Sequence, residues 1–115
     1  MNLVVLSGNI SKVNELKGEG DKAVLVFDLA VKKSSVREGE RDAWFHRCVA
    51  FGGVATAAAK FFERGMHIWV TGELQETQWD DDNGEKHFQK QVVVKQWEFG
   101  ERKRREQDDD NPFLA

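Results

Sequence analysis

The 115-residue sequence lacks several features that would define its class at once. A single cysteine, Cys48, excludes an internal disulfide framework and a cysteine-rich zinc site, and we expect it to be a small strand residue. No apolar run is long enough to span a bilayer, and the N-terminus carries no basic-then-apolar leader. These absences predict a single soluble, cytoplasmic domain.

Catalytic and metal-binding patterns are also missing. The sequence has no glycine-rich phosphate loop, nucleophile elbow or Cys/His pairing, and its three histidines (His46, His67 and His87) have no ligand spacing. The acidic run at residues 80–85 fails the calcium-loop pattern, because its glycine falls fifth and its twelfth residue is Gln91. We therefore expect no enzyme activity, no cofactor and no bound metal.

The sequence also lacks a positive net charge. The net charge is −3, and Asp108, Asp109 and Asp110 account for all of it, because the other 17 acidic residues balance the 17 basic ones. A strongly basic domain would have indicated nucleic acid by charge alone. Any polyanion must therefore be held by local basic patches and by non-ionic contacts.

Aromatic side chains are abundant, with four tryptophans and eight phenylalanines but no tyrosine. Most of these rings could fill the core of a small all-β domain. Over residues 43–51, however, alternation places Phe45, Arg47, Val49 and Phe51 on one strand face. That face is either a stacking platform or a core face with one salt-bridged arginine, and the sequence leaves both readings open.

The hydrophobic periodicity predicts three strands, one helix and two further strands. We expect strands at residues 3–10, 23–31, 43–51 and 66–74, and a hairpin that runs out through Trp79, turns at residues 82–84 and returns over 88–99. The expected helix covers residues 54–64, with Gly65 as its C-terminal cap. This order fits an all-β, five-stranded Greek-key barrel, the OB-fold, with its helix between strands three and four.

Basic residues are interleaved with the aromatic ones, a combination that sequence-independent binding of single strands requires. Rings stack on bases, at about 1–3 kcal/mol per base, and cations follow the phosphates. The candidate stacking residues are Phe45, Phe51, Trp79 and Phe88, and the candidate phosphate contacts are Lys32, Lys33, Arg41 and Arg47.

The order of residues resembles that of the bacterial-type single-stranded DNA-binding protein (SSB) family. The matching stretches are NLVVLSGNI at 2–10, FDLAV at 27–31, WFHRCVAFG at 44–52, GMHIWVTGEL at 65–74, WDDDNG at 79–84 and DDDNPF at 108–113. The resemblance implies an OB-fold domain over residues 1–100 that coats single-stranded DNA without sequence preference. It also implies a homotetramer associated with the nucleoid, acting in DNA replication, repair and recombination.

The resemblance carries over to individual residues. Three of the family's stacking aromatics fall on Phe45, Phe51 and Trp79, and His46 aligns with a histidine that the family uses at its subunit interface. A fourth family aromatic falls near Ser34 or Ser35, where this sequence has no ring, so Trp44 or Phe88 is a candidate substitute.

Residues 101–115 form a charged connector and an acidic tip. Adjacent carboxylates repel one another, so the tip should be solvated, and it carries a ring at Phe113. A merely solubilising terminus is the alternative. The resemblance implies that the tip docks replication and repair proteins, although Leu114 and Ala115 follow the phenylalanine on which the family typically ends. The expected docking residues are Asp108, Asp109, Asp110, Pro112 and Phe113.

A second hypothesis is an OB-fold adaptor of the primosome type, in which protein–protein contacts dominate. The missing loop aromatic favours this adaptor, and the acidic tip argues against it.

Overall fold

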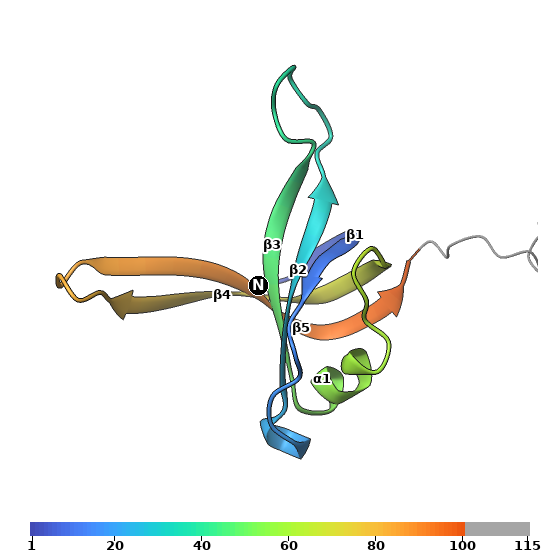
Figure 1. Ribbon diagram of the computed structural model, residues 1–115, viewed down its shortest axis with the longest axis vertical. Coiled ribbons are helices and arrows are strands. Elements are labelled where there is room, and N and C mark those ends of the chain that lie inside the picture. Colours follow the sequence, from blue (N-terminus) through green and yellow to red (C-terminus); the bar gives the residue numbers. More distant parts are fainter. Residues whose placement is uncertain (101–115) are drawn as a thin grey trace, which may run out of the picture.

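The computed structural model describes residues 1–100, which form five strands and one α-helix (Figure 1). This element order and the all-β class confirm the prediction. The predicted docking residues Asp108, Asp109, Asp110, Pro112 and Phe113 lie outside the described residues. The elements are β1 (Val4–Val13), a 3-10 turn η1 (Gly20–Lys22), β2 (Val24–Lys32), β3 (Ala43–Phe51), α1 (Gly52–Ala59), β4 (His67–Asp80) and β5 (Lys86–Phe99).

The strands close into a barrel in the order β1-β2-β3-β5-β4, with β4 returning to β1. All neighbours are antiparallel except β3 and β5, which run parallel from Cys48–Val92 to Ala50–Val94. A parallel pair needs a long crossover connection, and here α1 and β4 supply it. The closed five-stranded barrel with its helix between β3 and β4 is the predicted OB-fold. No helix in the described part of the chain is long and apolar enough to cross a membrane.

The core follows from the alternation on β2. Leu25, Phe27 and Leu29 are each 1 % exposed or less, as their period-two spacing predicts. Burying each of them contributes about 1.5–3 kcal/mol to folding. They pack inside the barrel with partners from every other strand, including Ile10, Cys48, Ile68, Val70, Val92 and Val94.

Cys48 lies fully inside this core. Burial, and secondarily the negative charge of Asp28, raises the pKa of the Cys48 thiol to about 12. The thiol therefore stays neutral at physiological pH, and Cys48 is the small buried strand residue that the sequence predicts.

Two glycines allow the strands to approach closely enough for the barrel to close. A Cβ on Gly8 of β1 would collide with the carbonyl of Ala30 on β2, and a Cβ on Gly72 of β4 would collide with the carbonyl of Val93 on β5. Only a residue without a side chain fits at such positions.

The predicted bounds of the helix are wrong. α1 begins two residues earlier than expected and ends five residues earlier, at Ala59. The apolar stripe continued to Phe62 because the ring of Phe62 closes the barrel, 5.0 Å from the ring of Phe27 and 4.9 Å from that of Trp97. Gly65 does not cap α1, because it lies in the turn before β4, where its amide donates to the Ile10 carbonyl.

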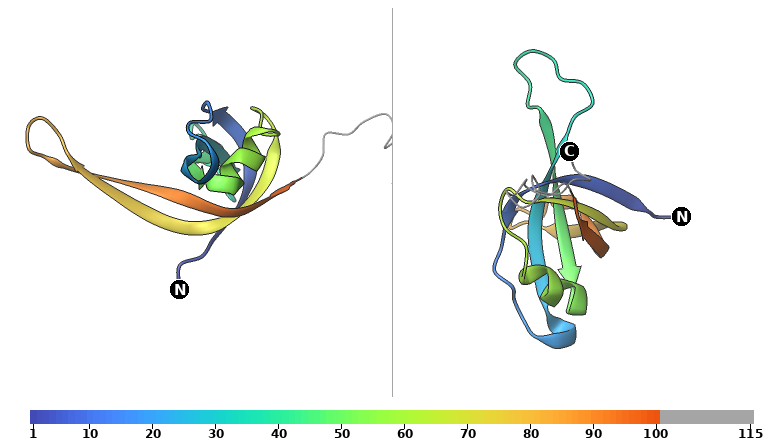
Figure 2. Two further views of the ribbon diagram at one scale, coloured as in Figure 1. Left: turned by 90° about the horizontal axis from the view of Figure 1, so that it is seen from below. Right: turned by 90° about the vertical axis from the view of Figure 1, so that its right-hand side faces the viewer.

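Two hairpins extend beyond the barrel at a wide angle to each other (Figure 1). The β2–β3 arm (residues 30–45) points up in that view, and the β4–β5 arm (residues 75–91) points to the left. The second arm is long because β4 and β5 have 14 residues each and pair out to Asp80–Lys86. Figure 2 shows this arm curving away from the barrel.

Candidate nucleic-acid interface

Aromatic side chains lie mainly on the surface. Within residues 1–100, Phe27 and Phe62 are buried, whereas the other five phenylalanines are exposed. The alternative, that most rings fill the core, is therefore wrong for the phenylalanines of residues 1–100. Large exposed apolar groups in this number indicate binding surfaces. The exposed rings are Phe45, Phe51, Phe61, Phe88, Phe99, Trp44, Trp69 and Trp79.

The outward face of β3 carries two of the predicted stacking residues. Phe45 and Phe51 are 53 % and 46 % exposed, while Cys48 and Ala50, on the other face, are fully buried. Between the two rings, the Nε atom of Arg47 lies 3.7 Å from the Asp28 carboxylate of β2. Because both rings are exposed, this is not a core face, although its arginine is ion-paired as that alternative expected.

The same face continues across β5 to the β4–β5 arm. Val49 of β3 pairs with Val93 of β5, and alternation from Val93 leads along one face of β5 to His87. His87 lies opposite Trp79 of β4, and their rings stack. Phe45, Phe51 and Trp79 therefore share a surface, which we call the outer face, consisting of the outward side of β3 and the matching side of the β4–β5 arm.

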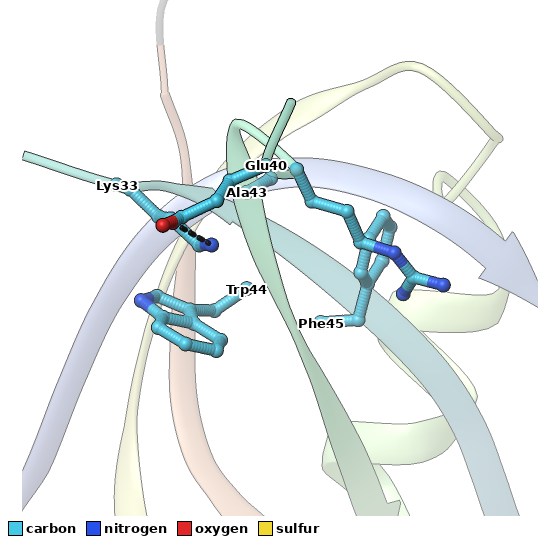
Figure 3. Close-up of a pocket in the computed structure, with 6 residues that line it drawn as sticks. Lys33, Glu40, Ala43, Trp44 and Phe45 are labelled. Atoms are coloured by element: carbon cyan, nitrogen blue, oxygen red, sulfur yellow. Dashed lines mark ion pairs between the residues drawn. The ribbon is translucent and has the colours of Figure 1, made fainter. Parts of the chain in front are cut away.

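Two other candidate rings do not lie on the outer face. Phe88 pairs with Gln78 and shares a strand face with Val92, so its ring lies on the opposite side of the arm from Trp79. Trp44 likewise lies opposite Phe45, and Figure 3 shows these two rings on opposite sides of β3. The structure therefore does not bring Phe88 or Trp44 together with the other three rings.

The basic candidates divide between the two faces of the β2–β3 arm. Lys32 pairs with Ala43 and so lies on the side of Phe45, whereas Lys33 lies on the side of Trp44. The Nζ of Lys33 lies 4.1 Å from the centre of the Trp44 ring and 3.7 Å from the Glu40 carboxylate. Because Glu40 partly compensates the charge of Lys33, Lys32 is the more available of the two lysines for a phosphate contact.

Arg41 lies near the tip of the same arm. Its guanidinium carbon lies 5.9 Å from the centre of the Phe45 ring, within reach of a cation–π contact. An open hollow of about 340 Å³ lies beside it. Lys33 lies over the Trp44 ring and Arg41 over the Phe45 ring, and Figure 3 shows these two rings on opposite sides of β3. The hollow is lined by Lys33, Glu40, Arg41, Ala43, Trp44 and Phe45.

The turn of the β4–β5 arm contains a cluster that the sequence reasoning missed. Ligand-type atoms of Asp81, Glu85 and His87 lie within 4.8 Å of one another. Nε2 of His87 donates to Oδ2 of Asp81 at 2.7 Å, so these two groups are satisfied by each other without an ion. Ligand spacing did not reveal the cluster, but a three-residue turn over residues 82–84 pairs Trp79 with His87 and is the signal that could have pointed to it.

His46, the predicted interface residue, lies half-buried on β3 and pairs with Leu29. It shares a strand face with Cys48, so it lies at the rim of the barrel interior and not on the outer face. Its role at a subunit interface stays a prediction.

An OB-fold whose outer face presents exposed rings beside basic side chains has the architecture of a nucleic-acid-binding domain. Comparison with known proteins defines its family. Residues 1–100 match the Single-strand binding protein family. This chain therefore belongs to that family, which confirms the resemblance seen in the sequence.

Individual relatives agree with this assignment. The chain is 38% identical to the single-stranded DNA-binding protein of Fusobacterium nucleatum over 107 residues, covering 90% of this chain and 69% of that protein. It is 35% identical to single-stranded DNA-binding protein 2 of Listeria innocua over 101 residues, covering 86% of this chain and 64% of that one. The chain thus spans about two thirds of the length of these curated relatives.

A solved structure shares the fold. The Plasmodium falciparum SSB in complex with ssDNA superposes with a TM-score of 0.73 at 20% identity, covering 88% of this chain and 96% of that one. At that identity, the likeness supports the OB-fold assignment.

Proposed function

We propose that this protein binds single-stranded DNA without sequence preference, coating and protecting it. The observation that carries the proposal is the outer face, on which Phe45, Phe51 and Trp79 are all exposed and are connected through β5. Every base has a π-face, so rings on a continuous surface bind bases without reading their edges. Family membership and the names of the relatives support the same function.

Phosphate contacts add to stacking in this proposal. Lys32 lies on the side of Phe45, Arg41 lies beside that ring, and Arg47 lies between the two rings of β3. Because Asp28 already accompanies Arg47, we expect a modest salt dependence and a larger share of the affinity from stacking. Phe88, on the other side of the β4–β5 arm, would contact only a strand that wraps around that arm.

Tryptophan emission tests the proposal directly. Titration with oligo-dT at low salt should quench the emission, and Trp79→Ala should remove most of the quenching. Trp97→Phe is the matched control, because it also removes one indole but at a site packed against Phe61 and Phe62, so its quenching should persist. The absence of quenching in the unmodified protein would refute single-strand binding.

Self-association is a further part of the proposal, with a homotetramer as the expected state. Leu3, Val5 and Trp69 are exposed, and Val5 and Trp69 share the outward side of β1 and β4. An apolar area of this kind is suited to burial against another copy. Mass measurement in solution with and without a long oligonucleotide tests this, and a monomer in both conditions would contradict it.

Recruitment of replication, repair and recombination proteins is proposed for the acidic tip, with Phe113 as the anchor and Asp108, Asp109 and Asp110 as its acidic flank. This part depends on sequence and family alone. Phe113→Ala should abolish binding of such a partner while leaving oligo-dT binding intact. If the protein is instead an adaptor of the primosome type, protein–protein contacts should dominate. Its single-strand binding should then be weak and should be lost early in a salt series.

A further inference from the structure

The turn of the β4–β5 arm is held by the carboxylate of Asp81. Its Oδ1 accepts hydrogen bonds from the backbone amides of Asn83 and Glu85, at 2.9 and 2.8 Å. Its own amide donates to the Glu85 carbonyl, and its carbonyl accepts from the Gly84 amide. The remaining oxygen, Oδ2, is directed to Nε2 of His87. One side chain thus fixes both the turn and the imidazole.

The imidazole in turn contacts the indole of Trp79. The two rings are cross-strand neighbours whose centres are 5.5 Å apart, and their planes differ by 19°. One face of the indole is therefore covered by His87, although Trp79 remains 48 % exposed. Side chains on a hairpin surface usually sample several rotamers, and each one that must be fixed on binding reduces the affinity.

We propose that His87 and Asp81 are positioning residues for single-strand binding, with His87 backing one face of the Trp79 indole and Asp81 fixing the imidazole, so that the other indole face is presented to a base. The inference rests on the proposed function, because it assumes that Trp79 stacks on DNA. A base would then form the third layer of a base–indole–imidazole stack.

The hydrogen bond also fixes the tautomer of His87. An ionised carboxylate only accepts hydrogen bonds, so Nε2 of His87 carries the proton that it donates to Asp81. The indole of Trp79 covers one face of the same imidazole.

Asp81 accepts this hydrogen bond as an ionised carboxylate at neutral pH. Its hydrogen bond with His87, followed by those from the backbone amides of Glu85 and Asn83, lowers the pKa of the Asp81 carboxyl below its usual value. A lowered pKa means that the stabilising contact is present at neutral pH and is lost only as the pH falls through that lowered value.

The first measurement needs no DNA. The emission of the full chain, in the presence of EDTA to exclude cations, should change in His87→Ala, because one face of the Trp79 indole is then open to water. In a Trp79→Phe background the same substitution should have no effect, and His67→Gln alone should leave the emission unchanged. An emission unchanged in His87→Ala would overturn the inference whether or not the protein binds DNA.

The second measurement is oligo-dT affinity. His87→Ala should weaken binding by roughly 2- to 10-fold, the value of one aromatic pair. His87→Phe should restore most of the affinity, because a ring again backs the indole. An affinity of His87→Ala equal to that of the unmodified chain would refute the positioning role while leaving the proposed function intact.

Asp81 has a matched control next to it. Asp81→Asn and Asp82→Asn remove the same charge at the same turn, but only the first loses the carboxylate that holds His87. Asp81→Asn should weaken oligo-dT binding more than Asp82→Asn. Equal effects would show that general charge at the turn, and not positioning, is responsible. Failure of the unmodified chain to bind oligo-dT would instead refute the proposed function.

Discussion

The barrel and its two arms use the same kinds of side chain in opposite ways. In the barrel, apolar side chains face inward around Phe27, and within residues 1–100 no polar side chain is buried. On the arms, the rings of Phe45 and Trp79 face solvent beside cations or an imidazole. The barrel is stabilised by burial, whereas the arms keep apolar surface available for a ligand. Changes in the barrel should therefore reduce stability, and changes on the arms should reduce binding.

The largest effect is expected in the barrel, at Gly72. Gly72→Ala adds a Cβ that collides with the carbonyl of Val93 and should lower the free energy of unfolding by about 3 kcal/mol. Gly53→Ala is the matched control, because nothing lies within 4 Å of its Cβ, and alanine in the first turn of α1 should stabilise by up to about 1 kcal/mol. Urea unfolding at a fixed protein concentration measures both. Equal unfolding midpoints would contradict the close approach of β4 and β5.

A smaller effect, on binding only, is expected on the outer face. Phe45→Ala and Phe51→Ala should each cost about 1–3 kcal/mol of oligo-dT affinity, or roughly 5- to 150-fold. The melting temperature should change little, because both rings are exposed. Phe61→Ala and Phe99→Ala are the controls, since these rings are about as exposed but contact each other, and Phe99 pairs with the buried Ile68. A similar loss of affinity in the controls would remove the distinction between the outer face and the rest of the surface.

The smallest effect concerns the ion pair on the outer face. Asp28→Asn should release Arg47 for phosphate contact and steepen the dependence of log K on log salt by up to about 0.7, while Arg47→Gln should make it shallower. Glu15→Gln, which removes a charge from the loop after β1, controls for net charge. If Asp28→Asn and Glu15→Gln change the slope equally, Asp28 does not compete with phosphate for Arg47.

Much of the barrel could be predicted because its signals are local. The alternation of Leu25, Phe27 and Leu29 identified β2 and its buried side, and the Asn83-Gly84 pair identified the turn between β4 and β5. The helix was predicted too long because Phe61 and Phe62 continue its spacing, although Phe62 is buried by a turn that closes the barrel. A spacing pattern indicates that a side chain is buried, but it does not indicate whether a helix or a turn buries it.

The sequence by itself determined the strands, the OB-fold order, the family and the kinds of side chain available for binding. Only the tertiary structure decided which rings share a surface. Thr71 pairs with Gln96 and Gly72 with Val94, so Lys95 is an extra residue in β5. Because of this bulge, the residues of β5 before Lys95 alternate between the two faces in the opposite phase to the residues after it. That bulge is the reason why His87 of β5 lies on the face of Phe45 while Phe88 lies on the other, whereas the side of Trp79 follows from the alternation of β4 itself. Alternation is a property of one strand, whereas register is set by packing between strands distant in the sequence.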